Sequence, residues 1–183
     1  VLKLDPPAFT VRREIVPVVN AAASFSTTIS KLELHGEALY NYSPKSRDDD
    51  YLRYVVGGRS AFDEFDKIPF LDKGDVKVEY AGEYLIKEQS NTDYDVSSED
   101  TRALKNDLLG SVEFDFAEDF AVYLSGQYDF EGRGIILLSD LEYSGLENLQ
   151  MNLKLQMLYA DGNSDLYSWR DNSRLITEVR YSF

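Results

Sequence analysis

Apolar and polar residues alternate with a period of two in segment after segment of this chain. The clearest example runs from Leu149 to Ala160, where apolar side chains at odd positions alternate with polar ones such as Asn152 and Lys154. Because successive side chains of a strand point to opposite faces, this period predicts a β-strand with one apolar and one polar face. An amphipathic helix would need apolar residues at i, i+3, i+4 and i+7, and no long segment has that spacing.

Eight segments share the alternation and are predicted to be strands, although Ile136 and Leu138 interrupt the polar side of one of them. The segments span residues 31–40, 52–59, 76–87, 104–116, 120–130, 134–145, 149–160 and 175–183. Residues 16–25 form a ninth strand followed by a turn at 26–28, or residues 1–28 form a periplasmic or plugging extension. The pattern leaves both open. Ten residues rising ~3.3 Å each and tilted by ~40° cover roughly 25 Å, the height of a membrane-spanning apolar band.

The connections between the predicted strands differ in length, and their lengths suggest on which side of the membrane each one lies. If the chain ends in the periplasm, the connections at 146–148 and 117–119 lie on that side and those at 161–172 and 89–101 lie outside. Two connections depart from this rule, because 131–133 is short for an outer loop and 65–74 is long for an inner one.

The last nine residues alternate strictly and end on Phe183, with Tyr181 two positions earlier. This segment resembles the closing strand of Gram-negative outer-membrane β-barrels. The pattern of residues 31–42, 54–58 and 76–80 is similar to the C-terminal half of larger porin-like proteins. The resemblance implies an all-β, transmembrane, antiparallel up-and-down barrel over 29–183, an outer-membrane location with lipid and lipopolysaccharide as neighbours, and Tyr181 and Phe183 as a signal for the barrel-assembly machinery. Because bacterial single-chain barrels have even strand numbers, a ninth strand implies further strands from an absent N-terminal part or another chain.

Composition permits this reading, although it also suits a soluble acidic domain. The chain is 43% apolar, 13% aromatic and 28% charged, with a net charge of -14 and a mean hydropathy of -0.37. No segment approaches the ~20 apolar residues of a spanning helix, but barrel strands have one polar face and stay low in hydropathy. The absence of Cys suits an oxidising envelope, and the start at Val1 suggests a processed or trimmed product. Strong acidity argues against a nucleic-acid partner.

Function depends on the polar face, which is expected to line the interior. In a wide barrel this wall passes small hydrophilic solutes with a mild preference for cations, because acids outnumber bases, and a polyanionic solute is disfavoured. In a narrow eight-stranded barrel the same charges must pair, because an unpaired buried charge is costly. The residues predicted to line the pore are Glu33, His35, Glu37, Arg53, Arg59, Lys77, Glu79, Glu83, Lys105, Asp107, Glu113, Asp115, Asp129, Asp140, Glu142, Lys154, Arg174, Glu178 and Arg180.

Catalytic and metal-binding patterns are weak, and no enzyme activity or cofactor is expected. His35 is interpreted as a wall residue beside Glu33 and Glu37, and the same-face carboxylate pairs 113/115 and 140/142 are interpreted in the same way. The stretch from Asp161 to Asp165 begins like a calcium loop but lacks its glycine at position six and its closing Glu. The acidic stretches at 48–50, 93–100 and 161–165 are interpreted as outer loops.

Two classes of function follow. The first is a passive porin or porin-like sheath, and the second is a closed eight-stranded structural or adhesive barrel without a conducting pore. A lipid-modifying enzyme using His35 and a soluble lipocalin-like barrel, with its apolar face inward, are the more distant alternatives.

Overall fold

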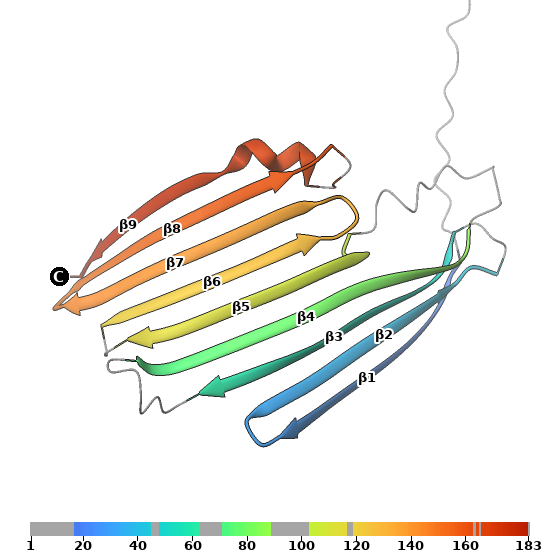
Figure 1. The fold of residues 1–183 in the computed structure, drawn as a ribbon, viewed down its shortest axis with the longest axis horizontal. Coiled ribbons are helices and arrows are strands. Elements are labelled where there is room, and N and C mark those ends of the chain that lie inside the picture. The colour runs from blue at the N-terminus through green and yellow to red at the C-terminus, as the bar shows by residue number, and fades with distance from the viewer. Residues whose placement is uncertain are drawn as a thin grey trace, which may run out of the picture.

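The computed structural model describes residues 17–44, 48–62, 71–88, 103–116, 119–162, 164 and 166–182. These residues form an all-β structure, an antiparallel sheet in which strand order follows chain order (Figure 1). The strands are β1 (Val19–Ile29), β2 (Leu32–Tyr42), β3 (Asp50–Phe62), β4 (Leu71–Lys87), β5 (Asn106–Phe116), β6 (Phe120–Asp129), β7 (Gly134–Leu146), β8 (Leu149–Ala160) and β9 (Arg174–Tyr181).

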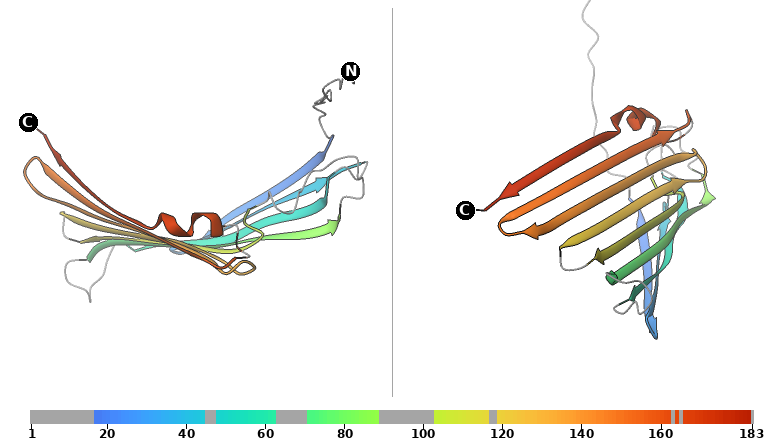
Figure 2. Two further views of the ribbon diagram at one scale, coloured as in Figure 1. Left: turned by 90° about the horizontal axis from the view of Figure 1, so that it is seen from above. Right: turned by 60° about the vertical axis from the view of Figure 1, so that its left-hand side comes forward.

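The sheet is a single twisted and curved layer, and β1 and β9 are its two edges (Figure 2). Each strand pairs with its sequence neighbours, so the topology is up-and-down, as the alternation predicted. The strand pairings run from β1 to β9 without joining these two edges, so the described sheet is open. No helix in the described part of the chain is long and apolar enough to cross a bilayer.

The N-terminal part of the sheet corrects one sequence prediction. Residues 26–28 were predicted to be a turn, but they belong to β1, and the turn lies at Ser30 and Lys31. Ser30 has a φ of 58°, in the left-handed region that tight hairpin turns require. The serine and threonine residues that suggested a loop instead continue the alternation of β1 as far as Ile29.

Other boundaries shift by a few residues. Strand β4 begins at Leu71 with an irregular register between Leu71 and Lys73. The connection from β3 therefore spans 63–70 and is shorter than predicted. The expected outer loop at 161–172 contains a short 3₁₀ helix, η1 (Tyr167–Asn172), which the alternation gave no reason to predict.

The connections occupy two ends of the sheet, in the order that the sequence predicted. One end has the tight connections at 30–31 and 147–148 and the end of β9, and the opposite end has the connections at 43–49, 88–105 and 161–173. At the tight end, Asn148 has a φ of 65°, a conformation that Asn adopts more readily than most residues. At the other end, Ser164 Oγ donates to Asp129 Oδ2 at 3.0 Å and ties the last connection to the preceding hairpin.

Candidate functional site

The register brings the predicted wall residues onto one face of the sheet, which is named here the polar face. Cross-strand partners share a face, and Glu33 is opposite Arg59, which is opposite Lys77. Likewise Arg53 is opposite Glu83, and Asp107 is opposite Asp129. By the same rule, Asp115, Glu142 and Glu178 lie on this face in one cross-strand row. Three further direct pairs lie on it as well, namely Asp140 with Lys154, Gln156 with Arg174, and Gln150 with Arg180. Lys105 lies just before β5, where its carbonyl accepts from the amide of Glu83.

The opposite face is apolar on all nine described strands, and is named here the apolar face. One cross-strand row illustrates this continuity from β1 to β8. It consists of Phe25, Gly36, Val56, Tyr80, Leu108, Tyr128, Ile135 and Tyr159. The alternation therefore fixes the register, because a slip of one residue would place polar side chains in this row.

On β8 the apolar side chains are more exposed than the polar ones, the reverse of a strand in a water-soluble protein, whereas β1 and β9 are exposed on both faces. On β8, Leu153 and Met157 are 39% and 50% exposed, whereas Lys154 and Gln156 are half-buried. Within the described ranges, the buried apolar residues are Leu71, Ala81 and Ala160. The apolar face is thus a continuous uncovered surface, larger than the scattered patches of ordinary soluble monomers.

Aromatic side chains border the aliphatic part of the apolar face on two sides. Near the tight end, Phe116 and Phe120 have ring centroids 6.1 Å apart, and Tyr143 is the register partner of Phe120. Near the other end, Tyr128 and Phe130 contact edge to face at 4.8 Å. Eight positions separate Phe120 from Tyr128 along β6, which corresponds to roughly 26 Å of strand and, at a tilt of ~40°, to roughly 20 Å along a barrel axis. An outer-membrane barrel has an apolar band ~25 Å tall between aromatic girdles.

Ion pairs on the polar face form within β4, between the neighbouring strands β3 and β4, and across β3 from β2 to β4. Glu79 accepts from Lys77 Nζ at 2.8 Å, and His35 Nε2 lies 2.7 Å from its other carboxylate oxygen. Arg59 Nε donates to Asp75 Oδ2 at 2.7 Å. His35 lies between Glu33 and Glu37 on the polar face of β2, as predicted, and its side-chain partner is a carboxylate two strands away.

The second half of the polar face has longer ion pairs and several short hydrogen bonds. Lys154 Nζ lies 3.6 Å from Asp140 Oδ2 and 3.9 Å from Glu178 Oε2, and the other oxygen of Glu178, Oε1, accepts from Arg180. Three hydrogen bonds from amide or guanidinium groups each include one further wall residue. These are Gln127 to Asp107 at 2.8 Å, Gln150 to Glu142 at 2.6 Å and Arg174 to Gln156 at 2.8 Å.

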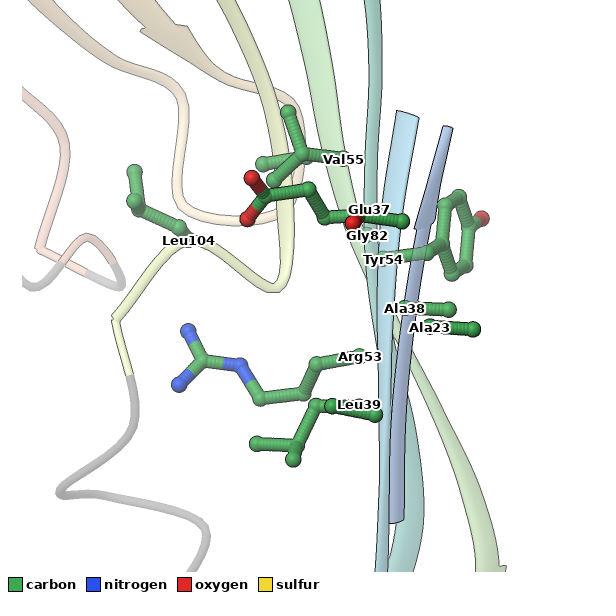
Figure 3. A pocket seen from close by; sticks show the side chains of 12 residues that line it. Ala23, Glu37, Ala38, Leu39, Arg53, Tyr54, Val55, Gly82 and Leu104 are labelled. Atoms are coloured by element: carbon green, nitrogen blue, oxygen red, sulfur yellow. The ribbon is translucent and has the colours of Figure 1, made fainter. Parts of the chain in front are cut away.

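A hollow of about 520 Å³ lies at β1 to β4, beside the segment that leads into β5. Figure 3 shows Glu37, Leu39, Arg53 and Val55 on the side of the strands where Leu104 lies, with Tyr54 and Ala38 on the other side. Arg53 donates to the carbonyl of Ala103 and holds this segment over the polar face.

No family model matches the chain, and neither a curated protein nor a solved structure is significantly similar to it. The interpretation of the site therefore depends on geometry alone.

A second hollow, of about 300 Å³, lies on the polar face at the centre of the sheet. Its lining includes Leu109, Tyr123, Ile136 and Leu138 among polar neighbours. The sequence pattern had marked Ile136 and Leu138 as interruptions of the polar side, but Leu109 and Tyr123 were not singled out. The sequence could have identified them, because each places a large, mainly apolar side chain where the alternation calls for a polar one.

The described acidic residues of the connections make local hydrogen bonds. Asp50 Oδ1 accepts from the amide of Ser43 at 2.7 Å, and Asn41 Nδ2 donates to the carbonyl of Asp49, so these residues shape the β2–β3 connection. Among the residues that the structure describes, no group of His, Asp and Glu is arranged to hold a metal. The stretch 93–100, part of the candidate calcium loop and the terminal Phe183 lie outside the described residues. Tyr181 ends β9 on the apolar face.

Proposed function

We propose that this sheet is part of the wall of an outer-membrane β-barrel that lets small hydrophilic solutes pass. In this proposal the apolar face contacts lipid acyl chains and the polar face lines a water-filled interior. The uncovered apolar face carries the proposal, because its aliphatic part is exposed and lies between aromatic rows roughly 20 Å apart along a tilted barrel axis, close to the ~25 Å apolar band of such barrels. Lipid would cover this surface, which no described part of the chain covers.

The two open edges favour a barrel larger than this sheet. An uncapped strand edge does not occur within hydrocarbon, because its backbone donors and acceptors would lack partners. With alternate strands antiparallel, β1 and β9 run in the same direction, so joining them directly would require one parallel pair. An odd number of further strands, from the same chain or a partner chain, would close an entirely antiparallel ring.

The composition of the polar face favours a mild preference for cations. Acidic residues exceed basic ones on this face, and rings of carboxylates select cations in pores. The ion pairs reduce the effect, since the carboxylate of Glu79 contacts Lys77 on the same strand and His35 two strands away. In the same proposal, lipopolysaccharide surrounds the end with the longer connections, and Tyr181 belongs to the signal for the barrel-assembly machinery.

A closed structural or adhesive barrel without a pore is the second candidate. The observation in its favour is the set of ion pairs between strands, exemplified by Arg59 with Asp75. A narrow barrel would need such pairs, because its interior has no room for the water that solvates free charges.

Single-channel recording in planar bilayers distinguishes the two candidates. Purified full-length protein is expected to give stepwise currents in KCl, and empty detergent is the control. A folded, membrane-inserted protein that gives no steps would overturn the porin proposal and favour the closed barrel. Flotation with lipid vesicles establishes insertion independently of current.

A further inference from the structure

The central hollow on the polar face has a thin floor made of small residues. Gly110 is opposite Gly126 and Ser111 is opposite Ser125, so two adjacent cross-strand pairs of β5 and β6 have almost no side chain. These four residues all line the hollow. Its volume of about 300 Å³ is at the lower end of the range for small-molecule sites.

Apolar side chains stand around this floor, where a pore wall would be expected to be hydrophilic. Leu109, Ile136 and Leu138 come from β5 and β7, and the ring of Tyr123 comes from β6 between them. Leu138 and Tyr123 are 40% and 42% exposed. Apolar surface open to the interior can bind the body of an amphiphilic molecule.

Carboxylates flank the aromatic ring on both sides. In the register, Glu113 is the partner of Tyr123 on β5, and Asp140 is its partner on β7. Asp140 is 3.6 Å from Lys154 through one oxygen, while its other oxygen is buried and without a hydrogen-bond partner in the described structure. Glu113 is exposed, and it interacts electrostatically with Arg59, which itself donates to Asp75.

The remaining charges at the hollow cancel one another. Lys77 and Glu79 both line it and form an ion pair of 2.8 Å. Glu113 and Asp140 lie beside the lining residue Tyr123 and add negative charge there, of which Arg59 and Lys154 neutralise a part. An aromatic face beside a carboxylate attracts an organic cation.

We propose that the hollow lined by Leu109, Tyr123 and Leu138 binds small organic cations that join an ammonium group to an apolar body. The apolar body lies against Leu109, Ile136 and Leu138, and the ammonium group lies between the ring of Tyr123 and the carboxylate of Glu113. This inference rests on the proposed function, because a ligand reaches the polar face through the interior of the barrel.

Equilibrium dialysis of the full chain in nonionic detergent tests the site without requiring conduction. The probes are phenethylammonium, neutral 2-phenylethanol and anionic phenylacetate, with empty micelles subtracted. We expect phenethylammonium to bind at least about ten-fold more tightly than the other two, a ratio equivalent to 1.4 kcal/mol. Equal binding of 2-phenylethanol would overturn the inference.

Three variants locate the binding. Glu113→Gln and Leu138→Asn are each expected to weaken phenethylammonium binding about ten-fold or more. Glu147→Gln removes an exposed carboxylate from the β7–β8 turn and is expected to leave binding unchanged. Unchanged binding in Glu113→Gln would overturn the inference. Circular dichroism establishes that each variant has kept its sheet.

Bilayer recording separates this inference from the proposed function. A protein that conducts but does not bind phenethylammonium would overturn the cation site and leave the porin proposal standing. A folded, inserted protein that binds phenethylammonium but never conducts would keep the site and overturn the pore.

Discussion

His35 Nε2 lies 2.7 Å from Glu79 Oε1, although β3 runs between the strands that carry them. The contact is possible because the β3 residue between them is Gly57, which has no side chain. A Cβ at Gly57 would lie 2.6 Å from Glu79 Cγ and 3.1 Å from His35 Nε2. Lys77 binds the second oxygen of the same carboxylate, so one acid holds two cationic or donor groups.

Substitution of Gly57 is expected to destabilise the sheet. In Gly57→Ala the new methyl would also meet the carbonyl oxygen of Val78 at 2.7 Å, and a backbone atom cannot move away easily. We expect a loss of about 1–3 kcal/mol in the free energy of unfolding, measured by urea denaturation in detergent.

Gly110→Ala is the matched control for Gly57→Ala. Its Cβ would meet only the carbonyl of Lys77, at an ordinary 3.7 Å. We expect unchanged stability or a gain of about 0.5 kcal/mol, because glycine is unfavourable in a strand. An equal loss in both variants would show that close packing at Gly57 is not the cause.

Charge placed on the two faces of β8 is expected to have opposite consequences. Leu153→Arg puts a cation on the aliphatic band, between its centre at Leu155 and the aromatic row of Phe120 and Tyr143, and is expected to cost about 1–3 kcal/mol of membrane folding free energy. Asn152→Arg puts the same cation on the polar face between Glu142 and Glu178, and is expected to be tolerated. Folding into lipid vesicles measures both. Detergent-free solubility of Leu153→Arg, with intact sheet structure, would contradict lipid contact at this face.

Tryptophan placed along the apolar face is expected to report its depth in the bilayer. In a Trp169→Phe background, tryptophan at position 120 or 159 is expected to be quenched most by lipids brominated near the headgroup. Tryptophan at position 155 is expected to be quenched most by lipids brominated near the chain ends, because it lies between the aromatic rows. Similar quenching at the three positions would show that the face does not span a bilayer.

Charge reversal on the polar face is expected to change ion selectivity. Asp115 and Glu142 lie in one cross-strand row, on either side of Ala121. Asp115→Lys and Glu142→Lys are expected to move the zero-current potential in a KCl gradient toward the anion value. Asp171→Lys reverses an exposed charge in η1, outside the strands, and is the control. A larger shift in the control would place the selective region at the loops.

The alternation predicted eight segments as strands, and the structure forms strands there, because one apolar side chain every second residue fits only an extended chain. The first strand was harder to predict. Its small residues, such as Ala22 and Ser24, give little contrast between faces, so its end was misplaced. The helix η1 was missed because it has no repeating face.

Contacts between strands could not be read from the sequence. The pairing of His35 with Glu79 depends on a glycine in a third strand, and the central hollow depends on two glycines and two serines coming opposite each other. Such contacts join residues far apart in the chain, and their partners are fixed only by the register.

The sequence by itself determined that this chain forms amphipathic antiparallel strands in chain order, because local alternation specifies both the strand and its two faces. Only the tertiary structure decided which polar residues contact one another, where the wall is thin, and that the described sheet has two free edges. These properties arise from the alignment of nine strands, and no single strand carries the information.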